Sequence, residues 1–253
     1  MIRLGSILFV IAFFSFLSCK EKELPDCPDE VKENEVKINL LSKYQDEVID
    51  FSTIYTTPEG YRIRFEKINV IGTNFTGDEN YNIAQSGVYK FDVDPLTWYR
   101  GVADYLSINS ISGNIGVPPE ENHRDPAARP LSDPLNIMNT GDMHWGWDPG
   151  YIFLMIEGRA DTTSTGEGAL NSVFLYHVGM NDLLRTFEVN DLNWEQQSTY
   201  LHETTIIIDM EKVFDNIHYV DIKEEPTSHT DPGEEPLSTK IIENFVSALR
   251  PKL

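Results

Sequence analysis

Alternation of apolar and polar residues is the clearest pattern along the chain. Within residues 61–66, Tyr61, Ile63 and Phe65 fall on one face of an extended segment, and the charged residues between them fall on the other. Residues 36–40 alternate in the same way. A period of two predicts half-buried β-strands that bury one face and expose the other.

Six further segments combine β-branched or aromatic residues with flanking Gly, Pro, Asn and Asp. They are residues 87–93, 105–111, 151–157, 172–178, 204–210 and 218–222. About eight strands separated by turns predict an all-β fold, either an antiparallel β-sandwich of Ig-like type or a barrel.

Near the C-terminus the period changes to that of an amphipathic helix. Its apolar stripe consists of Ile241, Ile242, Phe245, Val246 and Leu249. Ser238 or Thr239 is suited to cap the N-terminus of this helix, and Pro251 is suited to end it. Residues 117–141 are rich in Pro, Asn and Asp and predict a long loop.

The N-terminus has the pattern of an export signal. Arg3 precedes an apolar run over residues 7–17, which is too short to cross a bilayer. The run ends in Phe16-Leu17-Ser18-Cys19, which resembles a lipobox with Phe in place of the usual Leu. We therefore expect a lipoprotein signal peptide over residues 1–18 and lipidation of Cys19.

A charged, proline-bearing stretch follows Cys19 and has too little apolar surface to fold alone. It predicts a flexible tether over residues 19–34 and a β domain over residues 35–253. Its charge pattern resembles the surface-export tags of some Bacteroidetes lipoproteins. The expected location is the cell envelope, with Cys19 anchored in the outer-membrane lipid bilayer and the domain facing the periplasm or the cell surface.

Acidic residues outnumber basic ones by 41 to 20, which gives a formal net charge of −21. Such a surface repels phosphate backbones, so nucleic-acid binding is excluded, and it suits cations or a basic protein partner. If Cys19 carries lipid, Cys27 is the one cysteine left, and no intramolecular disulfide can stabilise the domain. Stability must then come from the apolar core.

Sequence signatures of catalysis are missing. The chain has no Gly-x-Ser-x-Gly elbow, no phosphate-binding loop and no His-Glu-x-x-His motif. Carboxylates are too numerous for any pair of them to point to acid–base chemistry. We expect no intrinsic enzymatic turnover.

The most unusual stretch is residues 141–158, which read GDMHWGWDPGYIFLMIEG and contain two of the four tryptophans. This stretch resembles the signature segment of the MbnP family, whose name comes from methanobactin, a copper-binding peptide. The resemblance extends to Asn-Ile-Gly-Val-Pro at residues 114–118 and Phe-Leu-Tyr-His-Val-Gly at residues 174–179. Ser-His-Thr at residues 228–230 resembles the Bacteroidetes lipoprotein branch of the family.

The resemblance implies a β-sandwich of the cell envelope that binds copper. It also implies a dihaem cytochrome-peroxidase-like partner that oxidises a tryptophan to kynurenine. Applied to this chain, it makes Trp145 or Trp147 the candidate for oxidation and His144 and His177 the candidate metal ligands.

The residues themselves are chemically suited to copper, because imidazole binds copper and Cu(I) also accepts thioether sulfur. Met143 and Met180 supply thioethers next to or near the two histidines. In a regular strand, however, Met143, Trp145 and Trp147 would face away from His144. A site that combines His144 with a tryptophan therefore needs a loop or bulge, which the neighbouring glycines favour.

Each candidate also has a purely structural interpretation. Either tryptophan could serve as a core anchor. His177 shares a strand face with Val173 and Leu175, which suits a buried histidine with satisfied hydrogen bonds. Asp142 could orient His144 or could simply be a turn residue.

The remaining histidines show no metal-ligand spacing. His123, His202 and His218 are expected on the surface, and His229 lies between acidic segments that predict a solvated loop. Two functions remain open at this stage. One is copper binding or delivery, and the alternative is a non-metal ligand-binding or interaction module of the cell envelope.

Overall fold

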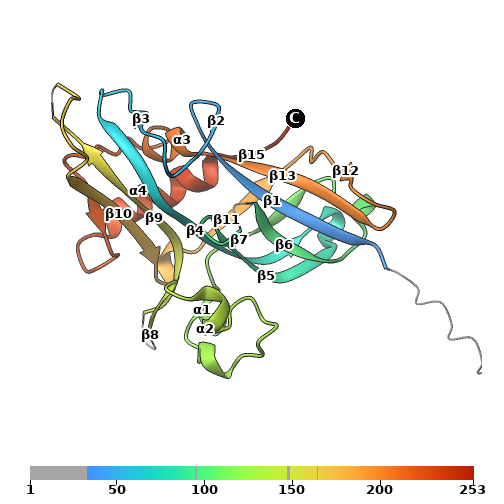
Figure 1. The fold of residues 1–253 in the computed structure, drawn as a ribbon. Helices are drawn as coiled ribbons and strands as arrows, with labels where there is room; N and C mark the ends of the chain where they lie inside the picture. The colour runs from blue at the N-terminus through green and yellow to red at the C-terminus, as the bar shows by residue number, and fades with distance from the viewer. Residues whose placement is uncertain (1–32, 95, 147–148, 164) are drawn as a thin grey trace, which may run out of the picture. The chain divides into compact units, whose positions relative to one another are not determined.

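Two curled β-sheets enclose the core in the computed structural model, which describes residues 33–94, 96–146, 149–163 and 165–253 (Figure 1). Residues 33–253 belong to one unit. The signal peptide, Cys19, the tether up to residue 32 and Trp147 lie outside the described residues. No helix among the described residues has the length and apolar character needed to span a membrane.

The smaller sheet is organised around β1 and β13, which pair in parallel from Glu35↔Leu201 to Lys43↔Asp209. Four further strands extend it within the described part of the chain. Its strands are β1 (Glu35–Tyr44), β2 (Glu47–Val48), β6 (Thr97–Val102), β12 (Glu195–Gln196), β13 (Leu201–Asp209) and β15 (Leu249–Pro251).

The larger sheet follows the order β11-β7-β4-β9-β10-β14, and three short or edge strands join it at β4 and β9. Its long central strands are β4 (Arg62–Thr76) and β9 (Gly150–Asp161). The others are β3 (Tyr55–Thr56), β5 (Asn82–Lys90), β7 (Ile111–Ile115), β8 (His144–Gly146), β10 (Ser172–Gly179), β11 (Arg185–Val189) and β14 (Thr227–Ser228).

The all-β sandwich predicted from the alternation is therefore confirmed. The strand pairs are antiparallel except at two places, where β13 lies parallel to β1 and β14 lies parallel to β10. β13 and β14 each come much later in the chain than the strand they pair with, so a long connection separates the two partners. Local sequence patterns carry no information about such pairings.

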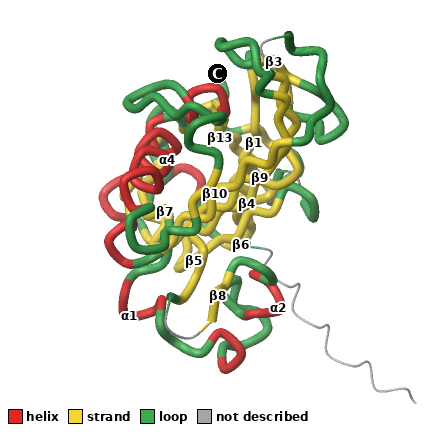
Figure 2. Tube along the Cα trace, turned by 90° about the vertical axis from the view of Figure 1, so that its left-hand side faces the viewer, coloured by secondary structure: helices red, strands yellow, loops and turns green. Residues whose placement is uncertain are grey.

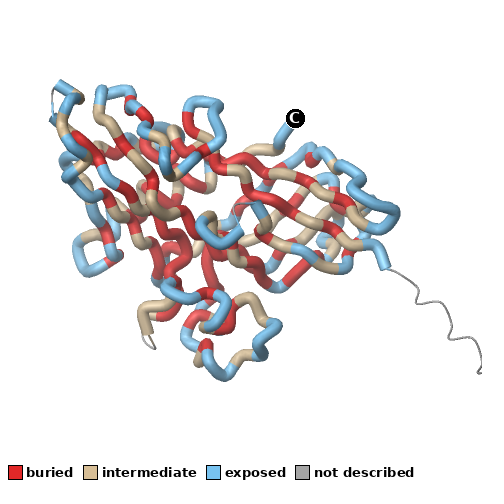
Figure 3. The backbone as a smooth tube through the Cα atoms, in the orientation of Figure 1, coloured by how far each residue is buried: buried red, intermediate tan, exposed pale blue. Residues whose placement is uncertain are grey.

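Side chains from the inner faces of both sheets form the main core. Long stretches of the strands are red, the colour of buried residues, in the backbone trace of Figure 3. Phe65 on β4 is fully buried, and its ring lies 5.9 Å from those of Tyr44 and Phe174. Burying such a ring stabilises the fold by about 1.5–3 kcal/mol. A separate apolar cluster covers the opposite face of β9, where Phe153 and Met155 pack with Val117 and Leu135.

Helix α4 (Glu235–Ser247) packs against β10 and β11. Figure 1 shows it alongside β10. Ile241, Ile242, Phe245 and Val246 form its apolar stripe as predicted, but Leu249 lies beyond the helix, and the N-terminus also differs from the prediction. The helix begins at Glu235 with Pro236 in the first turn, and Ser238 lies inside it as a buried residue. It also ends before Pro251, because residues 249–251 leave it to pair with β13 as β15.

Two predicted strands are wrong. Residues 105–107 form a 3-10 turn, since the Asp104 carboxylate accepts a hydrogen bond from the Leu106 N–H and caps it. Residues 218–222 form no strand beyond an isolated bridge between Asp215 and Tyr219. There the side-chain amide of Asn244 satisfies the backbone N–H and carbonyl of His218.

Residues 117–141 are more ordered than a loop. They contain the helical turns α1 (Pro119–Asn122) and α2 (Ile137–Thr140) with a 3-10 turn at Pro126–Ala128 between them. Together with β8, this segment forms a lobe beside one end of β9 (Figures 1 and 2). A further helical turn, α3 (Met210–Phe214), packs against α4.

Candidate functional site

The signature segment forms a distorted hairpin at the end of the larger sheet. His144 pairs with Tyr151 and Gly146 pairs with Gly150, and the register shifts between the two pairs. Gly146 and Gly150 have φ of +129° and +77°, values that favour glycine. A Cβ at position 150 would also lie 2.5 Å from Asn122 Oδ1. The bulge expected from the glycines is therefore present.

The His144 imidazole is half-buried and meets the Tyr151 ring edge to face, with centroids 4.6 Å apart. Its Nδ1 accepts a hydrogen bond of 3.0 Å from the backbone N–H of Gly146. Burial lowers the pKa of His144 below its usual 6.5, although the Asp125 carboxylate acts in the opposite direction. The ring is therefore neutral at pH 7, with the lone pair at Nδ1 and the proton at Nε2.

Asp142 does not serve as the hydrogen-bond acceptor of His144 in the described contacts. Its carboxylate pairs with the Lys67 ammonium, which also lies 3.8 Å from Glu157. Burial is the largest single influence and acts to raise the pKa of Asp142, but the hydrogen bond and charge of Lys67, together with the charge of Lys90, outweigh it and the pKa is lowered. Asp142 therefore links the hairpin to β4 through charge.

Trp145 occupies the space above a glycine of β10. A Cβ at Gly179 would lie 2.4 Å from Trp145 Cζ3 and 2.7 Å from the Tyr151 carbonyl oxygen. The indole is half-buried and packs against the second apolar cluster. Trp145 therefore combines packing with partial access from solvent, and only Gly179 leaves room for it.

His177 lies on β10, and its Nε2 is 2.9 Å from Glu157 Oε1 on β9. The hydrogen bond from His177 is the largest cause that lowers the pKa of Glu157, and Lys67 adds to it. The His177 side chain is 13% exposed. One ring nitrogen, Nε2, thus has a hydrogen-bond partner, and no described contact joins His177 to His144.

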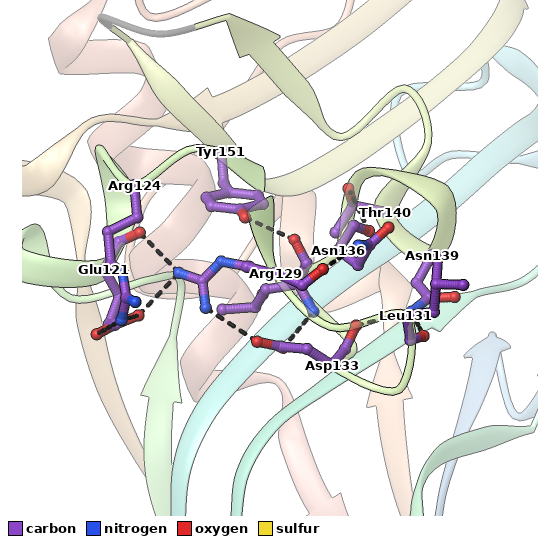
Figure 4. Close-up of polar contacts among 10 residues, drawn as sticks. Glu121, Arg124, Arg129, Leu131, Asp133, Asn136, Asn139, Thr140 and Tyr151 are labelled. Carbon is purple, nitrogen blue, oxygen red and sulfur yellow. Dashed lines mark hydrogen bonds and ion pairs between the residues drawn. The ribbon is translucent and has the colours of Figure 1, made fainter. Parts of the chain in front are cut away.

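A buried guanidinium holds the lobe together. The Arg129 side chain is 8% exposed and pairs with Glu121 at 2.8 Å and Asp133 at 3.1 Å (Figure 4). Its charge lies 6.0 Å from the centre of the Tyr151 ring, whose hydroxyl donates to the Leu135 carbonyl. Arg129 thereby fixes the surface against which His144 rests, a role that the sequence pattern did not reveal.

Asn122 and Asn181 connect the lobe to the sheet. The Asn122 carboxamide accepts from the Tyr151 N–H and donates to Asn181, and the Asn181 amide lies 3.1 Å from His123 Nε2. A pocket of about 290 Å³ opens beside this chain of contacts. It is lined by His123, Pro149, Met180, Asn181 and Asp182.

The other histidines differ in environment. His202 is buried and stacks on Tyr105 with ring centroids 3.7 Å apart, so its predicted exposure is wrong. His218 pairs with Glu243 at 2.8 Å. His229 is exposed, as predicted for a solvated loop, but its ring lies against that of His177.

Donor groups are sparse around the candidate ligands. Within the described residues, no three His, Cys, Asp or Glu side chains are grouped so that they could hold a metal ion. The Met143 thioether is fully buried in the second apolar cluster, whereas Met180 is exposed. A metal could reach Met143 only if this cluster opened, whereas the half-buried His144 imidazole and the exposed Met180 thioether require no rearrangement of the core.

A wide cleft lies away from the hairpin, between the edges of β5 and β6 and the lobe. It has a volume of about 860 Å³ and contains both cationic and apolar side chains. Its most exposed apolar residues are Val93, Leu131 and Met138, each more than 70% exposed. An apolar rim of this kind is typical of a binding surface.

Comparison with known proteins identifies proteins that are similar to this chain. The model of the MbnP family matches residues 33–231. Among solved structures, MbnP from Methylosinus trichosporium is similar, with a TM-score of 0.50 and 12% sequence identity. The likeness covers 83% of this chain and 88% of that one, and it shows a shared fold. No curated protein matches the chain.

Proposed function

Because the chain belongs to the MbnP family, we propose that it is an exported lipoprotein that binds copper in the cell envelope. The observation that carries this proposal is the state of His144. A half-buried, neutral imidazole stands on a glycine-bounded hairpin, in the segment that resembles the family signature. A neutral imidazole is the form that binds copper.

The hydrogen bond from Gly146 decides how His144 could take a metal. Nδ1 holds the lone pair, and a metal would bind there only by displacing the Gly146 N–H. Binding through Nε2 would require the ring proton to move to Nδ1, which would break the same bond. Either route would release Gly146, so copper binding should loosen the bulge. His177 remains a proposed second imidazole, and binding through both would require the hairpin to move.

Copper would supply a soft, redox-active centre. The net charge of −21 raises the local concentration of cations around the chain and supports this proposal. The acidic surface also suits docking of a basic protein, and we propose the dihaem cytochrome-peroxidase-like partner in this role. That partner would oxidise an indole to kynurenine, with Trp145 as the described candidate and Trp147 as the other.

The proposed attachment of the domain is through lipid on Cys19, with residues 19–34 as the tether. Lipidation would hold the domain on the outer membrane, facing the periplasm or the cell surface. No catalytic turnover of its own is proposed for the chain. A peroxidase or hydrolase activity that disappears on replacement of one polar residue would contradict this view.

Mass spectrometry of the intact protein from its native cells tests the proposed function as a whole. We expect lipid on Cys19, retained copper under gentle conditions and an oxidised Trp145 or Trp147. Kynurenine formation replaces one ring carbon with oxygen, so peptide masses locate the modified residue. Protein made beside its haem partner that carries no copper above background and no mass change would contradict the proposal.

A second candidate function rests on the 860 Å³ cleft at the edges of β5 and β6. Its apolar rim favours a non-metal binding or interaction module of the cell envelope. Replacing Leu131 and Met138 with Ser should then abolish binding of the non-metal ligand or partner in this cleft and leave copper binding unchanged. The copper function is favoured if these replacements change no interaction of the protein in native cells, whereas H144A changes one.

A further inference from the structure

His177 and His229 bring two imidazoles together on the outer edge of the larger sheet. Their ring centroids are 5.0 Å apart and their planes meet at 85°. His177 belongs to β10, and His229 directly follows β14, the strand that lies parallel to β10. Residues more than fifty positions apart in sequence are thus neighbours in space.

The backbone around His229 is fixed from both sides. Ser228 and Thr230 are buried, and their hydroxyls lie 2.7 and 3.0 Å from the Ser238 hydroxyl of α4. Thr230 also donates a hydrogen bond of 2.9 Å to the carbonyl of His177. Because its neighbours are clamped, His229 is directed outward and held over β10.

Thr230 adopts a φ of +61°, in the left-handed region that a β-branched residue rarely enters. The His229 N–H is bonded to the Glu234 carboxylate, which closes the turn. Backbone strain of this kind persists only where the surrounding contacts over-determine it, and it often accompanies function. At this turn the strained backbone places the exposed His229 imidazole next to that of His177.

Glu157 sets the chemistry of His177. Its Oε1 lies 2.9 Å from His177 Nε2, and a carboxylate oxygen in such a contact accepts the hydrogen bond. The His177 Nε2 must therefore carry the proton, which leaves the lone pair at Nδ1. A carboxylate that holds a histidine in this way is the usual support of a metal-binding imidazole.

We propose that His177 and His229 form a transition-metal site for a borderline divalent ion such as Zn(II) or Cu(II). His177 would bind through Nδ1, His229 would supply the second imidazole, and water would complete the coordination. Glu157 orients His177 and does not ligate. This site goes beyond the proposed function, because it pairs His177 with His229 and does not require His144; His177 is the one ligand that it would share with the proposed copper site.

The chain contains a matched control for this pair. His218 Nε2 lies 2.8 Å from Glu243 Oε2, which repeats the histidine–carboxylate contact. Neither a ring contact nor a hydrogen bond joins His218 to a second histidine in the described part of the chain. If a histidine–carboxylate pair alone were sufficient for metal binding, His218 would bind as well as His177.

Calorimetric titration of Zn(II) into the metal-free full chain tests the site. We expect H229A to weaken zinc binding at least tenfold, and E157Q to weaken it about 10–100-fold. H218A should leave the zinc affinity within about twofold of the wild type. His229 is exposed, so H229A should fold normally, and circular dichroism checks this.

The proposal is overturned if the wild type binds no zinc, or if H229A binds it as the wild type does. A loss in H218A equal to that in H229A would overturn it as well. Zinc binding that survives in H144A separates this site from the proposed copper site. Failure of one is therefore distinguishable from failure of the other.

Discussion

The Nδ1 atom of His144 accepts a hydrogen bond from the backbone N–H of Gly146, two residues further along the same hairpin. This contact fixes the tautomer of the ring and ties it to a glycine with a φ of +129°. The imidazole is therefore neutral and oriented before any ligand arrives. Several measurable properties depend on this arrangement and on the lobe that supports it.

In the metal-free protein, His144 should titrate below pH 6.5, because burial disfavours its charged form. Its folded-state pKa lies below the unfolded value, so the unfolded chain binds more protons in the interval between them. The contribution of His144 to stability is full above about pH 6.5 and is lost as the pH falls through that interval. NMR of the imidazole measures the midpoint, with the urea-unfolded chain as control. A folded midpoint at or above the unfolded one would contradict the account.

Replacing Arg129 with Met should destabilise the protein by about 3–5 kcal/mol, because it leaves Glu121 and Asp133 without their buried partner. Arg124 is the matched control, since it pairs with the same Glu121 but is 63% exposed. R124M should cost no more than about 1 kcal/mol. Urea unfolding measures both, and equal losses would show that Arg129 does not hold the lobe.

Ala in place of Gly179 should displace the Trp145 ring, since the added methyl would overlap Cζ3. Overpacking of this kind costs about 1–3 kcal/mol. Trp145 fluorescence should shift to longer wavelength as the indole moves into water. V173A, at an exposed position on the same strand, should leave the emission unchanged. An unshifted spectrum in G179A would mean that Trp145 does not pack on this glycine.

Acid should weaken the fold partly through Glu157. Its folded-state pKa is lowered, chiefly by His177, so its contribution to stability is present above about pH 4.5 and is lost as the pH falls further. Between about pH 5 and pH 3, where carboxyl groups titrate, the unfolding free energy of E157Q should fall less steeply than that of the wild type. E224Q, at an exposed carboxylate, serves as control and should follow the wild type. If the unfolding free energy of E157Q fell with pH as steeply as that of the wild type, the His177 contact would be excluded as a source of stability.

The sequence pattern predicts the sandwich well where side chains alternate. The alternation over residues 61–66 coincides with the start of β4 at Arg62. The strand then has a bulge between Phe65 and Lys67 and continues to Thr76. Nothing in the alternation marks that bulge, because it depends on the register with β9. The pairing of β1 with β13 is likewise invisible, since it joins segments more than 150 residues apart.

The lobe and the second histidine pair escape sequence analysis for a different reason. In residues 117–141, side chains of Arg129, Asn136 and Asn139 satisfy backbone carbonyls that a helix or strand would otherwise pair. Such local bonding has no period. His229 appears solvated in sequence because its neighbours are acidic, whereas hydroxyl contacts to Ser238 place it on His177.

Copper titration of the wild type and of H144A, made and purified together, tests the central claim most directly. We predict that the wild type binds at least one equivalent of copper and that H144A loses one, while H123A retains the wild-type stoichiometry. Circular dichroism confirms that each variant is folded. Copper binding by H144A with unchanged stoichiometry and affinity would contradict the assignment of the site to His144.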